Sequence, residues 1–290
     1  MRSTDKLFKY FTADGAVRLF ETMGIRFTQP DFLNDPYECH LAFDKDVRLQ
    51  LVDHFYNSMV ANETTKSEAE LRDIAERNED TLLINALKGY REIKKDLGVL
   101  SLTECPLNLL MWAHYADEHK GVVVELDYTH ESLFKMSSGG KEFSTLNAVR
   151  YQNEKVVGLP FPDKVVESLL TKSPEWEYER EWRFIRTLNL LDEVKPDIYI
   201  QKLDPKAIKR VIFGARFPGK RLAEITKFTD RTEFSHVKLE KATMIPNRFG
   251  LKTVSLDKFA WTLLHREHHF GEVAQEALLS VVMEDDEIEP

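Results

Sequence analysis

The chain has few cysteines and no long apolar segment. Of its 290 residues only Cys39 and Cys105 are cysteines, which is too few for a disulfide framework and fits a reducing cytosol. No apolar run approaches the roughly 20 residues that cross a bilayer. The opening residues, MRSTDKLFKYF, lack the apolar stretch of a secretory signal. We therefore expect a soluble, cytoplasmic protein without a membrane partner.

Several signatures of common enzymes and binding proteins are also missing. The sequence contains no Walker loop, no GxGxxG fingerprint and no GxSxG nucleophile elbow. The net charge of -9 argues against a surface that binds nucleic acid, because phosphate contacts need concentrated Lys and Arg. A local basic cluster keeps nucleic acid open as a partner without favouring it, since solvated surface charge explains the cluster as well. The cluster consists of Lys206, Lys209, Arg210, Arg216, Lys220 and Arg221.

The residues that are present predict an α+β fold. Apolar residues make up 42% of the chain and charged residues 31%, the balance of an ordinary globular protein. Short strand patterns alternate with irregularly placed helices, which favours a mixed, mostly antiparallel sheet. We expect a single domain over residues 1–255, with a helical insertion at about 44–96 in which Ser67 and Glu70 have capping-box spacing. Residues 256–290 read as a C-terminal helix and an acidic tail.

The segment Trp176–Arg186 is the richest in candidate functional residues. Read as a strand, its side chains alternate between two faces, so that Glu177, Glu179 and Glu181 share one face and the other face is mainly aromatic. Three carboxylates on one face repel each other and raise at least one pKa unless cations balance them. The pattern therefore leaves two interpretations open, a solvated outer face or a functional cluster.

The segment Phe32–Glu38 contains an Asn-Asp-Pro sequence, which favours a tight turn with side chains bonded to the local backbone. A purely structural turn explains it. The functional interpretation is a loop that carries Asn34, Asp35 and Glu38 to the rim of a pocket.

Two further segments offer polar groups. Ser101 and Thr103 point to the same strand face, where their hydroxyls can support a polar ligand. His114 and Tyr115 lie on a predicted short helix over residues 108–116, and a lone helical histidine is more often a packing or capping residue than a base.

A metal centre is not predicted. His265, His268 and His269 have a helical spacing that suits a metal ion. They lack matching cysteines and an HExxH context, so we expect neither a metal nor a tightly bound cofactor.

In their order along the chain, the motifs resemble the bacterial family catalogued as domain of unknown function 2971. The resemblance covers roughly residues 6–215. The segments that carry it are Leu7–Tyr10, Arg26–Glu38, Leu100–Thr103, Met111–Tyr115 with Lys120–Val122, and Lys172 ahead of Trp176–Arg183.

The motif order is also similar to that of the ADP-ribosyltransferase fold. Those enzymes carry an Arg, His or Tyr on an early strand, a Ser or Tyr on a middle strand and a Glu on a late strand. The corresponding positions are Tyr10 (or Lys9), Ser101 and Glu181, with Glu179 two residues earlier. The early position departs from the pattern, because Lys-Tyr stands in place of a clear Arg or His.

This second resemblance implies an enzyme that consumes NAD as its substrate, either an ADP-ribosyltransferase (a glycosyltransferase) or an NAD glycohydrolase. It further implies a toxin or phage-defence effector whose macromolecular acceptor is unknown. Glu181 would stabilise oxocarbenium-like charge, and Glu179 would orient the nucleophile. Ser101 would hold the ribose and Tyr10 would contact the nucleotide. The other residues expected to bind the nucleotide are Thr103, Asn34, Asp35, His114, Tyr115 and Arg183.

Two other classes of function stay open. A non-enzymatic ligand-binding or sensor module would use the Asn-Asp-Pro loop and the aromatic strand as its recognition surface. A nuclease would gather carboxylates around Mg²⁺, which prefers oxygen ligands, although the sequence has no recognisable acidic metal motif. Its candidate ligands are Asp35, Glu38, Glu179 and Glu181.

Overall fold

The computed structural model describes residues 6–62, 65–134 and 145–256. Its contacts divide the chain into two compact units, and the single domain expected over residues 1–255 stays a prediction. Unit 1 contains the chain up to Leu7, Gly24–Cys105 and Tyr128–Leu203, and unit 2 contains Phe8–Met23, Pro106–Asp127 and the chain from Asp204 onward. The predicted C-terminal helix and tail lie outside the described residues from position 257, as do the three histidines at 265, 268 and 269.

In unit 1 the strand β10 (Glu181–Thr187) lies between β4 (Leu97–Thr103) and β6 (Thr145–Ala148) and is antiparallel to both. Its first six residues are buried although they include a glutamate and two arginines. Buried charges persist only when they are paired and hydrogen-bonded, so this strand requires partners for its ionic side chains inside the unit.

The other strands of unit 1 form three smaller sheets. One is an antiparallel sheet of three strands in the order β11-β12-β2, and the other two are parallel pairs, β3 with β8 and β7 with β9. The strands are β2 (Gly24–Phe27), β3 (Leu41–Ala42), β7 (Arg150–Tyr151), β8 (Val156–Val157), β9 (Thr171–Lys172), β11 (Glu193–Lys195) and β12 (Ile198–Lys202).

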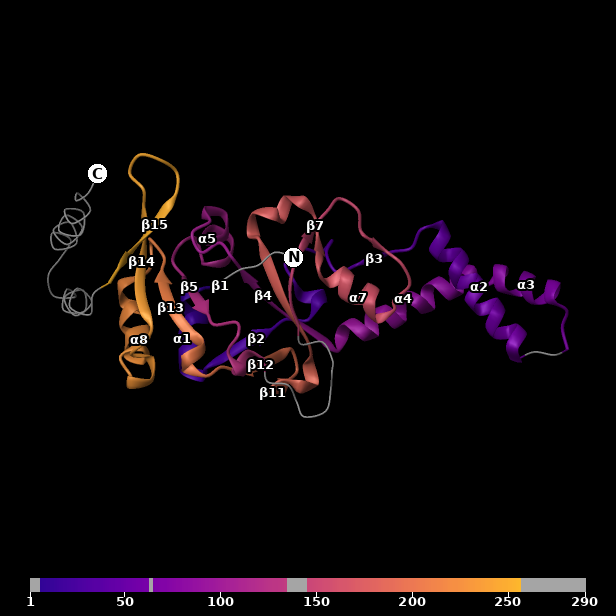
Figure 1. The fold of residues 1–290 in the computed structure, drawn as a ribbon, viewed down its shortest axis with the longest axis horizontal. Helices are drawn as coiled ribbons and strands as arrows, with labels where there is room; N and C mark the ends of the chain where they lie inside the picture. Colours follow the sequence, from indigo (N-terminus) through magenta and orange to yellow (C-terminus); the bar gives the residue numbers. More distant parts are fainter. Residues whose placement is uncertain (1–5, 63–64, 135–144, 257–290) are drawn as a thin grey trace. The chain divides into compact units, whose positions relative to one another are not determined.

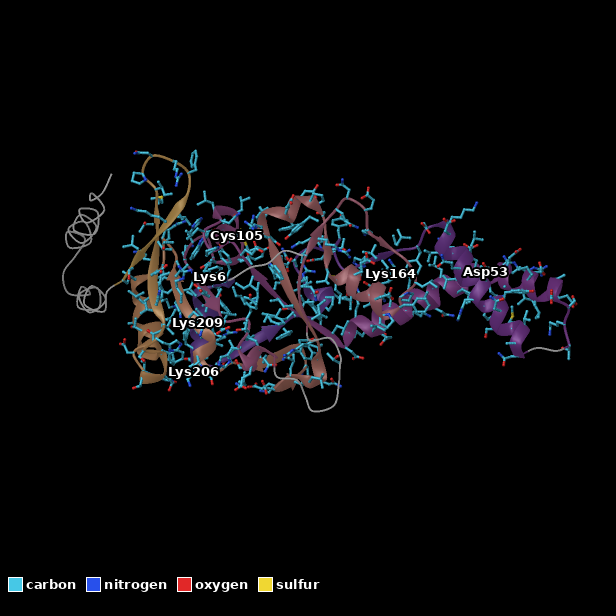
Figure 2. The ribbon with its side chains drawn as sticks, viewed as in Figure 1. Lys6, Asp53, Cys105, Lys164, Lys206 and Lys209 are labelled. Carbon is cyan, nitrogen blue, oxygen red and sulfur yellow. The ribbon has the colours of Figure 1, made fainter. Side chains whose placement is uncertain are left out.

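The helical insertion predicted for residues 44–96 is confirmed. It consists of α2 (Lys45–Asn62), α3 (Glu68–Arg77) and α4 (Glu79–Lys95), which follow one another in Figure 1. The capping box is confirmed too, because Ser67 and Glu70 satisfy each other's backbone N–H groups at the start of α3. Asp53 of α2, labelled in Figure 2, forms an ion pair with Arg72 of α3 at 2.5 Å.

A hydrophobic cluster of unit 1 joins α4, β4 and β10 to the short helix α7 (Pro162–Leu169). Tyr90 in this cluster donates its hydroxyl hydrogen to the backbone oxygen of Cys39 at 2.7 Å. The loop before β3 is therefore tied to the helical insertion. The buried members are Cys39, Leu41, Tyr90, Leu97, Val99, Val156, Val165, Leu169 and Ile185.

Unit 2 has the strand order β15-β14-β13-β5-β1. Its strand β13 is parallel to β14 and antiparallel to β5, and β14 is antiparallel to β15. The predicted α+β fold with a mixed, mostly antiparallel sheet is thus confirmed. The elements of the unit are β1 (Leu7–Phe11, in unit 2 from Phe8), α1 (Ala13–Thr22), α5 (Leu109–Tyr115), β5 (Val122–Leu126), β13 (Ile208–Phe213), α8 (Gly219–Thr229), β14 (Lys238–Met244) and β15 (Leu251–Ser255).

Some residues of the basic cluster of unit 2 form ion pairs with carboxylates. Figure 2 labels Lys206 and Lys209 of this cluster. Lys209 pairs with Asp127 at 3.1 Å. Arg210 lies between two carboxylates, 2.7 Å from Glu125 and 3.1 Å from Glu240. These pairs favour the interpretation as balanced surface charge. Among the helices of the described residues, none combines the length and apolar character that a membrane crossing requires.

A left-handed turn lies between α5 and β5. Asp117, Glu118 and His119 have φ angles of 46°, 54° and 69°, a conformation that costs an L-residue roughly 1–2 kcal/mol. The turn is held by the backbone N–H of His119, which donates to the oxygen of Trp112 at 3.1 Å, and by the parallel stacking of these two rings. At its end, Gly121 donates to the oxygen of Ala116 at 2.7 Å.

Replacing Gly121 by alanine is expected to destabilise unit 2 by about 1–3 kcal/mol or more. A Cβ atom at this position would lie 2.0 Å from the backbone oxygen of Phe11 and 2.9 Å from Cα of Ala116, and main-chain atoms cannot move aside cheaply. Urea denaturation of the full chain measures the effect. The matched control is Gly89→Ala in α4, where nothing lies within 4 Å of the added Cβ; if both variants were equally stable, the close approach would be refuted.

Candidate functional site

The segment Trp176–Arg186 does not form one continuous strand, and this prediction was wrong. Pro174–Glu179 is a 3₁₀ helix, η2, and the strand β10 begins only at Glu181. Proline favours the first turn of a helix because its ring fixes φ and it has no N–H to satisfy. Arg180 then turns the chain with a φ of 45°. Glu177 and Glu179 therefore do not share a strand face with Glu181.

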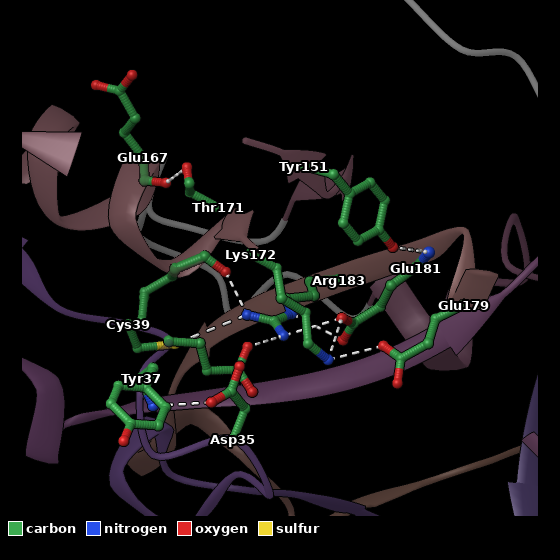
Figure 3. Close-up of polar contacts among 12 residues, drawn as sticks. Asp35, Tyr37, Cys39, Tyr151, Glu167, Thr171, Lys172, Glu179, Glu181 and Arg183 are labelled. Atoms are coloured by element: carbon green, nitrogen blue, oxygen red, sulfur yellow. Dashed lines mark hydrogen bonds and ion pairs between the residues drawn. The ribbon is translucent and has the colours of Figure 1, made fainter. Parts of the chain in front are cut away.

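Arg183 is the centre of a buried ionic network at the start of β10 (Figure 3). Its guanidinium binds Glu181 in a bidentate way, with Nε 2.8 Å from Oε1 and Nη2 2.9 Å from Oε2. The same Nη2 also donates to Oε2 of Glu38. Nη1 donates to the backbone oxygen of Leu169 at 2.7 Å and approaches the sulfur of Cys39 at 3.7 Å. The two parallel bonds from Arg183 to Glu181 match the planar geometry of a guanidinium group.

Lys172 of β9 completes the network. Its ammonium lies 2.7 Å from Oε2 of Glu179 and 3.6 Å from Oε2 of Glu181, and 4.4 Å from the centre of the Trp176 ring. Burial acts to lower the pKa of this lysine, but the surrounding carboxylates outweigh burial and raise it. We refer to Glu38, Glu179, Glu181, Lys172 and Arg183 as the ion network; it contains three carboxylates and two cations.

The pairing of β4 with β10 sets the surroundings of Glu181. In this register Glu181 lies opposite Thr103 and Arg183 lies opposite Ser101, so the four side chains share one face. Burial acts to raise the pKa of Glu181, but the charges of Arg183 and Lys172, with hydrogen bonds from Arg183 and Ser101, lower it to about 2. Glu181 is therefore an ionised carboxylate with an exposed fraction of 4%. Thr103 donates its hydroxyl hydrogen to the backbone oxygen of Glu179.

A polar pocket of about 170 Å³ lies beside the ion network and has Glu38 and Lys172 in its wall. A second pocket, lined by the aromatic rings of Tyr37, Trp176 and Tyr178, shares Asp35, Tyr37 and Ser173 with the first. We refer to them as the polar pocket and the aromatic pocket. The polar pocket is further lined by Cys39, His40, Gln152, Asn153, Glu154, Lys155, Val156, Ser168 and Thr171.

The loop before β3 carries Glu38 into the wall of the polar pocket. Asp35 accepts a hydrogen bond from the backbone N–H of Tyr37 at 2.8 Å, which is the turn expected from the Asn-Asp-Pro sequence. Cys39 follows with a φ of 58°, a strained conformation of the kind found at functional sites. Among the described residues, the Oε1 atom of Glu38 is buried without a hydrogen-bond partner, and such an atom carries a desolvation penalty of about 1–3 kcal/mol.

The buried thiol of Cys39 has low reactivity. It is 2% exposed, and burial raises its pKa to about 12 even though Arg183 acts in the opposite direction. Because the thiolate is the nucleophile, Cys39 does not qualify as a catalytic group.

The structure brings together most of the predicted site residues that belong to unit 1. Ser101 and Arg183 contact Glu181, Thr103 contacts Glu179, and Lys172 links the two glutamates. Asn34 lines the aromatic pocket, and Asp35 lines both pockets.

The remaining predicted residues belong to unit 2. Tyr10 is buried on β1 and packs edge-on against Trp112, with ring centres 5.4 Å apart. His114 and Tyr115 lie on α5, where their rings contact each other at 6.2 Å.

Lys172 is the residue of the network for which no role was predicted from the sequence. A lysine at the end of the mainly apolar run Val165–Thr171 was a usable signal, because a lysine that is buried needs a carboxylate partner. Glu38 was predicted as a rim residue or a metal ligand. Among the described residues, no group of three or more His, Cys, Asp or Glu side chains is arranged to hold a metal ion.

The fold and site thus define an α+β protein with a buried ion network next to two pockets that share three lining residues. The model of a family described as "Protein of unknown function (DUF2971)" matches residues 111–184. The resemblance expected from the motifs is confirmed for this stretch, which contains Met111–Tyr115 and Trp176–Arg183. No curated protein and no solved structure matches the chain.

Proposed function

We propose that the chain is an enzyme that cleaves the bond between nicotinamide and ribose in NAD, as a glycohydrolase or an ADP-ribosyltransferase. One observation carries the proposal: Ser101 on β4 is hydrogen-bonded to an ionised Glu181 on β10. A serine on a middle strand and a glutamate on a late strand are the pair that the ADP-ribosyltransferase resemblance implies. A role as toxin or phage-defence effector is part of the same proposal.

In this reaction the C1′–N bond breaks, and its electron pair goes to the ring nitrogen, so that nicotinamide leaves uncharged. The positive charge that develops on the ribose resembles the oxocarbenium ion of glycoside cleavage. The negative charge of Glu181 stabilises it, because the carboxylate is fixed in place before the reaction begins. Water, or a group on an acceptor, then bonds to C1′ and loses a proton, for which Glu179 is the candidate base.

The proposal sets a condition on Lys172. Glu181 is buried, while Lys172 is both its neighbour at 3.6 Å and part of the wall of the polar pocket. A substrate that enters from this pocket reaches Glu181 only if the ammonium of Lys172 moves. The ion pair of Lys172 with Glu179 at 2.7 Å gives the ammonium a second anchor during that movement.

The test measures loss of NAD and release of nicotinamide by the purified full chain, with and without cell lysate as a source of acceptors. We expect Glu181→Gln to lower turnover at least about a hundredfold and Ser101→Ala about tenfold. The matched control is Glu177→Gln, an exposed glutamate of the same segment, which should keep wild-type turnover. All variants are first compared in thermal stability, because the network is buried. No turnover by the wild-type protein in either condition would refute the proposal.

A second candidate is a non-enzymatic ligand-binding or sensor module. It is favoured by the fact that neither the polar nor the aromatic pocket has Glu179 or Glu181 in its lining. A module of this kind needs the pockets but no reactive carboxylate. It predicts that Glu181→Gln, if folded, keeps the biological phenotype of the wild type, whereas the enzyme proposal predicts loss of that phenotype.

A further inference from the structure

Among the residues in the wall of the polar pocket, Glu38 and Lys172 belong to the ion network and supply a hydrogen-bond acceptor and a donor. The acceptor is Oε1 of Glu38, which is buried and has no partner among the described residues. The donor is the ammonium of Lys172, which has three N–H groups, two of which are directed to Glu179 and Glu181. Both residues line the same pocket, and the Glu38 charge is close enough to act on Lys172.

The rest of the ion network holds the acceptor in place. Arg183 binds Oε2 of Glu38 and is itself fixed by its two bonds to Glu181. Guanidinium only donates hydrogen bonds, so the glutamate keeps one oxygen on Arg183, and its other oxygen has no partner among the described residues. A buried acceptor in this state gains most from a ligand that brings an N–H or O–H group.

We infer that the polar pocket binds a primary carboxamide carried on a small ring, with its N–H₂ group donating to Glu38 and its oxygen accepting from Lys172. A carboxamide presents a donor and an acceptor side by side, which is the complement of this pair. The volume of about 170 Å³ admits one small ring, and the aromatic pocket that shares Asp35 and Tyr37 extends the site. The identification of the group as nicotinamide rests on the proposed function.

Charged groups of either sign fit less well. A carboxylate would bring its negative charge against Glu38, and an ammonium or guanidinium would bring its positive charge against Lys172. Like charges in a desolvated pocket repel each other strongly. At Glu38 and Lys172 an uncharged group with both hydrogen-bonding functions therefore fits best.

The inference also connects binding with the proposed chemistry. Lys172 lies 3.6 Å from Glu181 but 2.7 Å from Glu179, so the contact with Glu181 is the looser one. When the ammonium donates to the carboxamide oxygen, it moves away from Glu181 and leaves that carboxylate to act on the ribose. Binding of the leaving group then also removes the Lys172 ammonium from Glu181.

The experiment compares nicotinamide with nicotinate, two ligands of equal shape that differ in the carboxamide and the carboxylate. Ligand-observed NMR and titration calorimetry on the full chain measure their dissociation constants. For the wild-type protein we expect nicotinamide to bind at least about tenfold more tightly, the effect of one hydrogen bond to a charged partner. This comparison needs no variant, so it does not depend on whether a variant folds.

A single substitution should reverse the preference. In Glu38→Gln the amide oxygen must face Arg183, which only donates, and the amide N–H₂ group then faces the pocket beside Lys172. Two donors suit a carboxylate, so nicotinate should become the tighter ligand by roughly tenfold. The control is Glu154→Gln, the same substitution at an exposed position of the same pocket, which should keep the wild-type preference.

The outcomes separate this inference from the proposed function. Preference for nicotinamide without any NAD turnover would support the pocket and overturn the enzyme. NAD turnover whose nicotinamide inhibition is the same in wild type and Glu38→Gln would support the enzyme and overturn the pocket. Equal affinity of the wild type for nicotinamide and nicotinate, or binding of neither, would also overturn the inference.

Discussion

Replacing Arg183 by methionine is expected to destabilise unit 1 by about 3–5 kcal/mol. The guanidinium is 1% exposed and binds both Glu181 and Glu38, so its removal leaves two buried carboxylates without their main cation. The loss of stability arises because the two carboxylates stay buried without a cation. The intact network itself contributes less, since the desolvation penalty of its charges offsets much of their attraction. Urea denaturation of the full chain, followed by circular dichroism and by hydrogen exchange in β10, measures the effect.

The control for this experiment is Arg150→Met on β7 of the same unit. The Arg150 side chain is 57% exposed and pairs with Glu167 at 3.0 Å, and exposed pairs contribute about 0–1 kcal/mol. Equal stability of the two variants would show that the network does not have the buried geometry described for it. A double variant, Arg183→Met with Glu181→Leu, should recover part of the loss by removing one stranded charge.

Acid is expected to remove about 3 kcal/mol of stability through Glu181 alone. The pKa of this carboxylate is about 2 in the folded protein and 4.5 in a solvated reference, so its folded-state pKa is depressed. The contribution is then fully present above about pH 4.5 and is lost as the pH falls towards 2. Urea denaturation at several pH values between about 6 and 2.5 measures the decline.

Other carboxylates also protonate in this range, so the comparison is made with Glu181→Gln. The difference in stability between wild type and this variant should shrink as the pH falls, because the wild-type side chain becomes neutral as well. A difference that stays constant down to about pH 2.5 would contradict the depressed pKa of Glu181.

The sequence predicted the fold class because the relevant signals are local. The helical insertion has its own periodicity and a capping box at Ser67 and Glu70, and both depend on residues three or four positions apart. The same holds for the turn that begins at Asp35. Within unit 2, the short helix predicted over residues 108–116 is α5, and its cap is Asn108, whose side chain accepts from two backbone N–H groups.

The ion network was predictable only in part. Alternation along a strand suggested three carboxylates on one face, but Pro174 and the left-handed Arg180 divide the segment into a 3₁₀ helix and a strand. The cations that pair with the carboxylates come from two strands. Arg183 lies on β10 with Glu181, and Lys172 lies on β9. The second pairing depends on tertiary contacts, and sequence spacing does not encode it.

The pocket was beyond the reach of sequence patterns for the same reason. Glu38 and Arg183 are 145 positions apart in the chain, and within the described part of the chain the other oxygen of Glu38 has no partner. A local pattern could nominate Glu38 as a rim residue. It could not indicate which of its oxygens is occupied.

The two cysteines differ in exposure, and this difference allows transient opening of unit 1 to be measured by chemical modification. Cys39 is buried against Arg183, and burial raises the pKa of its thiol to about 12, so an alkylating reagent can modify it only when the unit opens. Cys105, labelled in Figure 2, is partly accessible and can be blocked first. The rate at which Cys39 is then alkylated measures how often the ion network opens. A ligand that fills the neighbouring pocket should lower this rate.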